Sequence, residues 1–177
     1  LAPLLKNLFL SEEFYSDRAV GAQIKSPVEL VVGLLRDLGV HELSNYAEVD
    51  GMIQEMGQEL FEPPDVKGWR YGRSWISANR VLLRYNAAAK LLQAAPQPGR
   101  SGVDLVGILE RGGCQSSTDA VDLFTKTCFA RPLNEQQRKK LIDYLGPLPP
   151  PPEWAKQRDE INNRLRTLLI LMISTPE

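Results

Sequence analysis

The sequence contains little of the chemistry that most active sites use. Among its 177 residues are one histidine, His41, and two cysteines, and aromatic residues make up only 7%. A zinc site needs three or four protein ligands, and no cysteine lies near His41. A Ser-His-Asp arrangement would need a serine context such as Gly-x-Ser-x-Gly, which is absent. We therefore predict no metal site, no cofactor and no catalytic residue.

Glycine motifs that cradle phosphates are also missing, since neither Gly-x-Gly-x-x-Gly nor Gly-x-x-x-x-Gly-Lys-Ser/Thr occurs. Basic residues are not in excess, because the 21 Lys and Arg are balanced by 22 Asp and Glu, which gives a net charge of -1. The longest basic run is Arg138 to Lys140. A surface that follows a phosphate backbone needs clustered Lys and Arg. The sequence therefore excludes nucleotide binding and makes nucleic acid an unexpected partner.

No long apolar run is present. The longest candidate, Leu165 to Ile173, has nine residues, against roughly twenty for a membrane-spanning helix. We interpret it as a core helix. The segment Leu1 to Leu10 lacks the basic start and small-residue cleavage site of a signal peptide. Both ends look cut from something longer, so residues 1–177 are expected to form a single helical domain at the C-terminal end of a larger protein.

Helix signals dominate what remains, whereas alternation of period two never persists. Ser26, Pro27 and Glu29 form an N-terminal capping pattern, and Gly39 is a typical helix stop. We predict an all-α, irregular fold of seven or eight helices with a Pro/Trp-rich loop. The predicted helices cover Leu4 to Phe9, Ser26 to Leu38, Asp50 to Met56, Ser74 to Gln93, Val103 to Arg111, Thr118 to Phe129, Asn134 to Leu145 and Glu153 to Ile173.

The stretch from Phe61 to Arg84 is the most distinctive part of the sequence, because it joins aromatic rings, arginines and a carboxylate. Flat rings can cover sugar faces and Arg can bind acidic oxygens bidentately, which would suit a sugar or an anion. The alternative is structural: the Trp rings fill a gap between helices while Arg80 and Arg84 bond the loop's carbonyls. The candidate ligand-binding residues are Asp65, Trp69, Tyr71, Arg73, Trp75, Arg80 and Arg84.

Two further sets of residues have both a functional and a structural interpretation. Cys114 and Cys128 could close a disulfide in an exported protein, or could be two unpaired thiols with Cys128 in the core. The acidic pairs Glu12-Glu13 and Glu59-Glu62 would act as acid and base only if their environments separated their pKa values. They stand in polar stretches, so solvated side chains are the expectation.

Several segments, taken in order, resemble the C-terminal part of the DUF1800 family of bacterial proteins. They are KSPVELVVGLLRDLG, GQELFEPPDVKGWRYGRSWI, RVLLRYNAAAKLL, ARPLNEQQRKKLIDYL and INNRLRTLLILMISTPE, with the Pro-Pro-x-x-x-Gly-Trp core at Pro63 to Trp69 as the most specific. The resemblance implies mainly helical structure, an extracytoplasmic location and a partner of the DUF1501 family. It implies no catalytic residue.

These observations leave three functional hypotheses. The leading one is a non-catalytic interaction or scaffold domain of an exported bacterial protein. The second is carbohydrate binding or processing, in which Trp69 and Trp75 stack on sugar and Asp65 or Glu62 supplies the acid. The third is completion of an active site that lies in a missing N-terminal region. The first two differ in one structural property, because a sugar site requires exposed Trp faces along a cleft.

Overall fold

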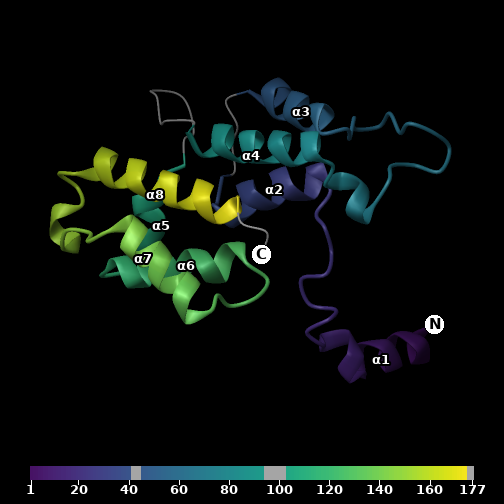
Figure 1. Cartoon of the computed structure of the whole chain (residues 1–177), viewed down its shortest axis with the longest axis horizontal. Coiled ribbons are helices and arrows are strands. Elements are labelled where there is room, and N and C mark those ends of the chain that lie inside the picture. Colours follow the sequence, from purple (N-terminus) through teal and green to yellow (C-terminus); the bar gives the residue numbers. More distant parts are fainter. Residues whose placement is uncertain (41–44, 94–102, 175–177) are drawn as a thin grey trace.

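The computed structural model describes residues 1–40, 45–93 and 103–174 of the chain (Figure 1). These residues form eight α-helices and contain no strand, which confirms the predicted all-α class. The helices are α1 (Ala2–Leu10), α2 (Pro27–Asp37), α3 (Tyr46–Glu55), α4 (Ala78–Gln93), α5 (Leu105–Arg111), α6 (Ser117–Cys128), α7 (Glu135–Leu145) and α8 (Arg158–Ile173). Three 3-10 turns, η1 (Glu12–Tyr15), η2 (Gly72–Trp75) and η3 (Pro151–Glu153), lie between them.

Capping residues fix the starts of α2 and α7 as the sequence predicts. The Ser26 hydroxyl accepts from the Glu29 amide at 3.3 Å, and the Ser26 amide donates to the Glu29 carboxylate at 2.7 Å. The backbone bond from Ser26 also lowers the pKa of Glu29. Asn134 and Gln137 make the same reciprocal pair in α7. Each pair satisfies two amides that a helix end would otherwise leave without partners.

The predicted first residue is wrong for two helices, α3 and α4. Helix α3 begins four residues before Asp50, because the Asn45 side chain accepts from the Glu48 amide at 3.3 Å and caps it there. Helix α4 begins at Ala78 and not after a Ser74 cap. The Ser74 hydroxyl instead donates backward to the Tyr71 carbonyl at 2.9 Å, and residues 72–75 form the 3-10 turn η2, so the α-helix starts only after that turn.

The last helix, α8, also begins later than predicted. Pro150 has the extended backbone expected of a proline run, but the chain then turns through η3. Trp154 is buried there, and its indole nitrogen donates to the Pro149 carbonyl at 2.7 Å. This side-chain bond holds the chain in a turn, so regular helix starts only at Arg158.

Helices α2 to α8 share one hydrophobic core. Helix α8 lies at its centre and packs against α4, α5, α6 and α7. Its core side chains are fully buried, namely Leu165, Leu168, Leu169 and Met172. The apolar run that the sequence marks as a core helix is thus buried by protein on several sides. None of the described helices is both long and apolar enough to cross a bilayer.

Helix α1 is different, because none of its residues is buried. It lies apart from the other helices at the purple end of the ribbon and is joined to them by an extended segment (Figure 1). Arg131, after α6, holds this segment by donating to the Asp17 and Val20 carbonyls. Phe9 and Phe14 make an edge-to-face pair with centroids 5.0 Å apart, which ties α1 to η1 but not to the core.

Candidate functional site

The Pro–Trp loop, residues 58–71 between α3 and η2, projects from the helical body (Figure 1). Phe61 and Tyr71 are 93% and 90% exposed, and Val66 is fully exposed. Phe61 has a left-handed backbone with φ of 68°, a conformation that is uncommon for a bulky residue. Asp65 accepts from the Lys67 amide at 2.7 Å, so its carboxylate closes a turn within the loop.

The base of the loop is anchored by Trp75 and Arg80. Trp75 is only 4% exposed, and the Arg80 guanidinium lies over its ring, 5.7 Å from the centroid, within cation–π range. Arg80 also donates to the Ser74 carbonyl. Its Nη2 would lie 3.1 Å from a Cβ at Gly57, whose φ of 96° is a left-handed conformation that favours glycine. Arg80 therefore holds η2 and the end of α3 against α4.

Trp69 is partly exposed, and its one polar atom is unsatisfied within the described residues. Its side chain is half-buried, and its indole nitrogen is buried without a hydrogen-bond partner among the described residues. Burial of an unpaired donor costs about 1–3 kcal/mol. Arg73 is exposed on η2. Six of the seven candidate residues therefore divide into an anchored base and an exposed part, while Arg84 lies at a different place, so the seven do not converge on one cleft.

Arg84 faces away from this loop. Its Nη1 donates to the Lys25 carbonyl at 2.8 Å, across 59 positions of sequence. Arg84 and Lys25 border a partly open cavity of about 470 Å³, which we call the interhelical cavity. Segment 21–25, α2, α4, the end of α6 and the end of α8 enclose it. Its apolar lining consists of Ile24, Leu30, Leu34, Ile76, Val81, Cys128, Phe129 and Ile173.

Three charged side chains border the interhelical cavity. Arg84 is half-buried, burial lowers the pKa of its guanidinium, and it belongs to none of the ion pairs within the described part of the chain. The Lys25 ammonium lies beside α2, 3.9 Å from where a Cβ at Gly33 would stand. Asp37 is the one carboxylate among the described residues of the lining. These described side chains, two cations and one carboxylate, carry an excess of one positive charge.

Cys128 also lines this cavity, and its thiol is neutral at ordinary pH. Burial, with a smaller contribution from the charge of Asp37, raises the pKa of Cys128 to about 11. Cys114 is buried, and burial raises the pKa of its thiol as well. Both are free cysteines. Helix α6, with its 12 residues, separates them by about 18 Å of helix length, whereas a disulfide requires Cα atoms within about 7 Å.

A polar cluster, buried at Asn162 and partly exposed at its charged side chains, joins α5 to α8, and the sequence offered no motif for it. The Asn162 side chain accepts from the Val106 amide at 3.0 Å, and Arg158 pairs with both Asp104 and Glu110. Burial alone would raise the pKa of Asp104, but hydrogen bonds led by Arg158 outweigh it and lower that pKa. Because its charges are paired within the protein, this cluster fastens two helices and leaves no group for chemistry.

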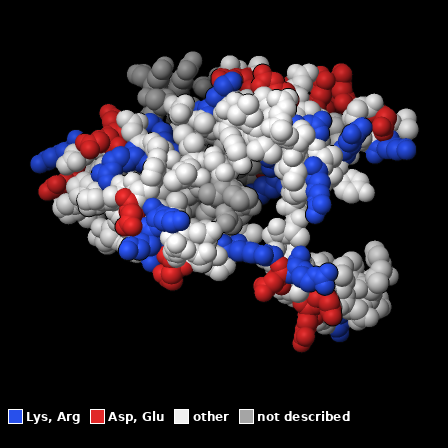
Figure 2. Space-filling view, in the orientation of Figure 1, with Lys and Arg blue, Asp and Glu red and all other residues white. Residues whose placement is uncertain are grey.

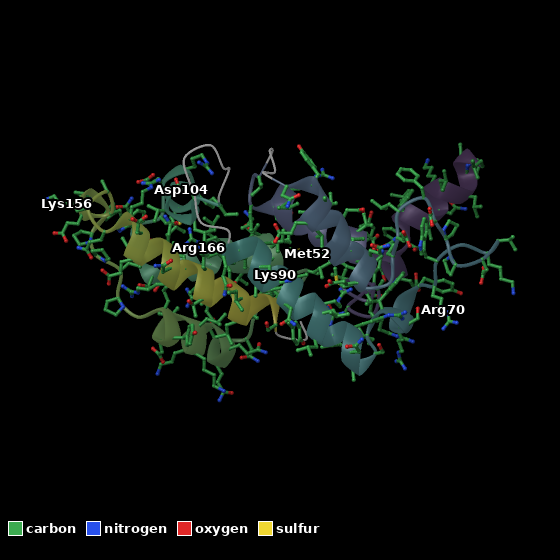
Figure 3. The ribbon with its side chains drawn as sticks, turned by 90° about the horizontal axis from the view of Figure 1, so that it is seen from above. Met52, Arg70, Lys90, Asp104, Lys156 and Arg166 are labelled. Carbon is green, nitrogen blue, oxygen red and sulfur yellow. The ribbon has the colours of Figure 1, made fainter. Side chains whose placement is uncertain are left out.

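Arg166 stands beside this cluster on α8 and is also buried (Figure 3). It donates to the Asn163 side chain at 2.9 Å, while its Nε lacks a partner in the described ranges. Figure 3 labels Asp104 and Arg166 near α8, while Arg70 of the Pro–Trp loop lies toward the other end of the molecule. The polar cluster and the loop are therefore separate features.

Residues suited to metal or acid-base chemistry do not gather in the structure. Over residues 1–40, 45–93 and 103–174, no three His, Cys, Asp or Glu side chains are placed to hold a metal ion. The pairs Glu12-Glu13 and Glu59-Glu62 are exposed. His41 lies outside the described residues.

Over the described residues, the fold and these sites define an all-helical domain with an anchored Pro–Trp loop and a sizeable interhelical cavity. The chain belongs to the DUF1800 family, whose model is described as a protein of unknown function and matches residues 1–177. No curated protein and no solved structure matches the chain.

Proposed function

We propose that this domain is a non-catalytic interaction domain of an exported bacterial protein, and that it binds a protein partner through the Pro–Trp loop and α1. The observation that carries the proposal is the exposure of large apolar side chains on both projecting parts. They are Leu4, Leu8, Phe9, Leu10, Phe61, Val66 and Tyr71. Large exposed apolar patches on folded proteins commonly mark interaction sites.

The Pro–Trp loop is suited to recognition because its base is held by contacts with α4 while its tip is exposed to solvent. Pro63 and Pro64 restrict the backbone, the Asp65 carboxylate closes a turn, and Arg80 anchors the end of the loop. A side chain presented on a restrained loop loses less conformational entropy on binding than one on a flexible loop. The exposed ring of Phe61 and side chain of Val66 are therefore the expected centre of contact.

Helix α1 offers a second, mainly uncharged surface. Its outer part is largely white in Figure 2, whereas acidic and basic side chains are interspersed over the visible face of the helical body. Alternating charges on the body disfavour a strongly charged partner. The DUF1501-family protein that the family resemblance suggests is the partner we propose.

The test is a calorimetric titration of the chain with a purified DUF1501-family protein from the same genome. We expect saturable binding that weakens at least tenfold in the Phe61→Ser, Val66→Ser double variant, because central apolar contacts dominate interface energy. Leu82→Ser is the matched control, since Leu82 is also exposed, at 58%, but lies on α4. Equal affinity of the double variant, of Leu8→Ser and of the wild type would contradict the proposed surface.

Nothing in the described residues favours the other two hypotheses. Sugar stacking required exposed Trp faces along a cleft, but Trp75 is buried and Trp69 is half-buried. Neither ring borders the interhelical cavity. Completion of an active site elsewhere would require a chemical group aimed outward from the domain, and the polar cluster around Arg158 is consumed by internal pairs.

A further inference from the structure

The interhelical cavity combines an apolar interior with an unpaired cation, and this combination is separate from the surfaces proposed for protein binding. We propose that the cavity binds a carboxylate-bearing acyl chain, with the Arg84 guanidinium holding the carboxylate and the apolar lining holding the chain.

The size and lining of the cavity fit a small amphiphile. Its volume of about 470 Å³ lies within the range of about 300–1,000 Å³ that is usual for small-molecule sites. Aliphatic side chains from three elements face it, including Ile24 on the extended segment, Leu34 on α2 and Val81 on α4. An acyl chain placed there would remove these surfaces and its own from water, which is the main favourable term for apolar ligands.

Arg84 is the group that selects an anionic head. A guanidinium has five N–H donors in a planar fork, and the one hydrogen bond described for Arg84 goes to the Lys25 carbonyl. It makes no ion pair with the carboxylates in the described ranges. A carboxylate accepts from such a fork bidentately, and the bond is stronger than one between neutral groups.

The other charges around the cavity are consistent with a single negative head group. Among the lining residues that the structure describes, Lys25 adds a second cation and Asp37 removes one charge, which leaves one positive charge for the ligand. Cys128 adds none, because burial keeps its thiol protonated below a pKa of about 11. A cationic head would meet Arg84 and Lys25 together, and an uncharged head would leave the guanidinium without an anion.

Comparison with Arg80, one helical turn earlier, shows why Arg84 is singled out. Arg80 is engaged with the Trp75 ring and the Ser74 carbonyl and does not border the cavity. Arg84 borders the cavity and uses one bond to fix its rim. The two arginines look equivalent in sequence, but of the two only Arg84 lines the apolar cavity.

The experiment is isothermal titration of the 177-residue chain with dodecanoate below its micellar concentration. Dodecan-1-ol and dodecyltrimethylammonium serve as neutral and cationic probes. We expect dodecanoate to bind with one site per chain, and Arg84→Met to weaken binding about tenfold to a hundredfold, as the loss of a charge-assisted bidentate pair implies. Arg73→Met is the matched control, because Arg73 is exposed outside the cavity, and its affinity should equal that of the wild type.

A second variant keeps the test decisive if Arg84→Met loosens the segment that Lys25 belongs to. Leu30→Trp fills the cavity from α2, leaves Arg84 in place and should abolish binding of dodecanoate while the chain still melts cooperatively. Equal affinity for dodecanoate and dodecan-1-ol would overturn the role of Arg84. Unchanged binding in Leu30→Trp would overturn the cavity as the site, whatever the result of the protein-partner titration.

Discussion

The helical body and the two projecting parts use the same apolar residue types in opposite ways. Leu165 and Leu168 of α8 are fully buried, whereas Leu4 and Leu8 of α1 are 67% and 46% exposed. Both helices have apolar residues at helical spacing, so the sequence pattern alone does not separate them. The difference lies in tertiary packing, because α8 is surrounded by four helices and α1 contacts η1. An apolar helix face therefore predicts that the face is buried against something. It does not predict which part of this protein, or which other protein, buries it.

A large expected difference in stability contrasts the two helices directly. Leu168→Ala should lower the free energy of unfolding by about 2–5 kcal/mol, because it removes fully buried methyl groups and leaves a cavity. Leu8→Ala in α1 should change it by no more than about 0.5 kcal/mol, as exposed positions usually do. Urea denaturation of both variants measures the contrast, and equal losses would mean that α1 belongs to the cooperative unit.

The same contrast between buried and exposed side chains exists between the anchored base of the Pro–Trp loop and its exposed part. Trp75→Ala should cost about 3–5 kcal/mol, because a buried ring and its contact with Arg80 are lost. Tyr71→Ala should stay within about 0.5 kcal/mol, since Tyr71 is 90% exposed. Thermal melts of the two variants in the same buffer would show this difference in stability. A large loss in Tyr71→Ala would place the tip in a contact that the structure lacks.

The buried thiol beside the interhelical cavity gives a pH-dependent contrast. The pKa of Cys128 is about 11 in the folded chain, against roughly 8.5 in an unfolded one. Because the folded pKa is raised, this group's stabilising contribution is complete below about pH 8.5 and is lost as pH rises toward 11.

Two measurements with Cys114→Ala as the background isolate this thiol. Iodoacetamide should alkylate native Cys128 far more slowly at pH 8 than it alkylates the urea-unfolded chain, because the thiolate is the nucleophile. The loss of stability between pH 8.5 and 11 should shrink when Cys128→Ala is added. Fast alkylation of the native chain at pH 8 would contradict the raised pKa.

The smallest effect is expected at Trp69, which joins base and tip. Trp69→Phe removes an indole donor that is buried without a partner and keeps most of the ring. The relief of that desolvation offsets the lost contact area, so unfolding free energy should change by less than about 1 kcal/mol in urea titrations. A loss similar to that of Trp75→Ala would indicate that the indole nitrogen has a partner in the folded protein.

Local signals predicted the fold wherever a few neighbouring residues decide the structure. The Ser26-Glu29 and Asn134-Gln137 capping boxes placed α2 and α7 because both partners lie within one helical turn. The start of α4 was wrong because Ser74 bonds backward inside a 3-10 turn, and the start of α8 because Trp154 bonds to Pro149.

The candidate sites were less predictable, because they depend on contacts distant in sequence. The carbonyl-bonding role suggested for Arg80 is present, but Arg84 reaches Lys25, 59 positions away, and not the loop. No local pattern connects segment 21–25 with α4 and the end of α6, so the interhelical cavity carries no signature in the sequence. The cluster of Asp104, Arg158 and Asn162 also joins residues that are far apart in sequence, so no local pattern predicts it.

The most direct test of the division between body and projecting parts is hydrogen exchange of the chain, alone and with the proposed DUF1501-family partner. We predict that bound partner protects amides of α1 and of the Pro–Trp loop, while the slow exchange of α8 is unchanged, since it already lies in the core. Complex formation that protects only amides of the helical body would contradict the account, because the exposed apolar residues would then have no part in binding.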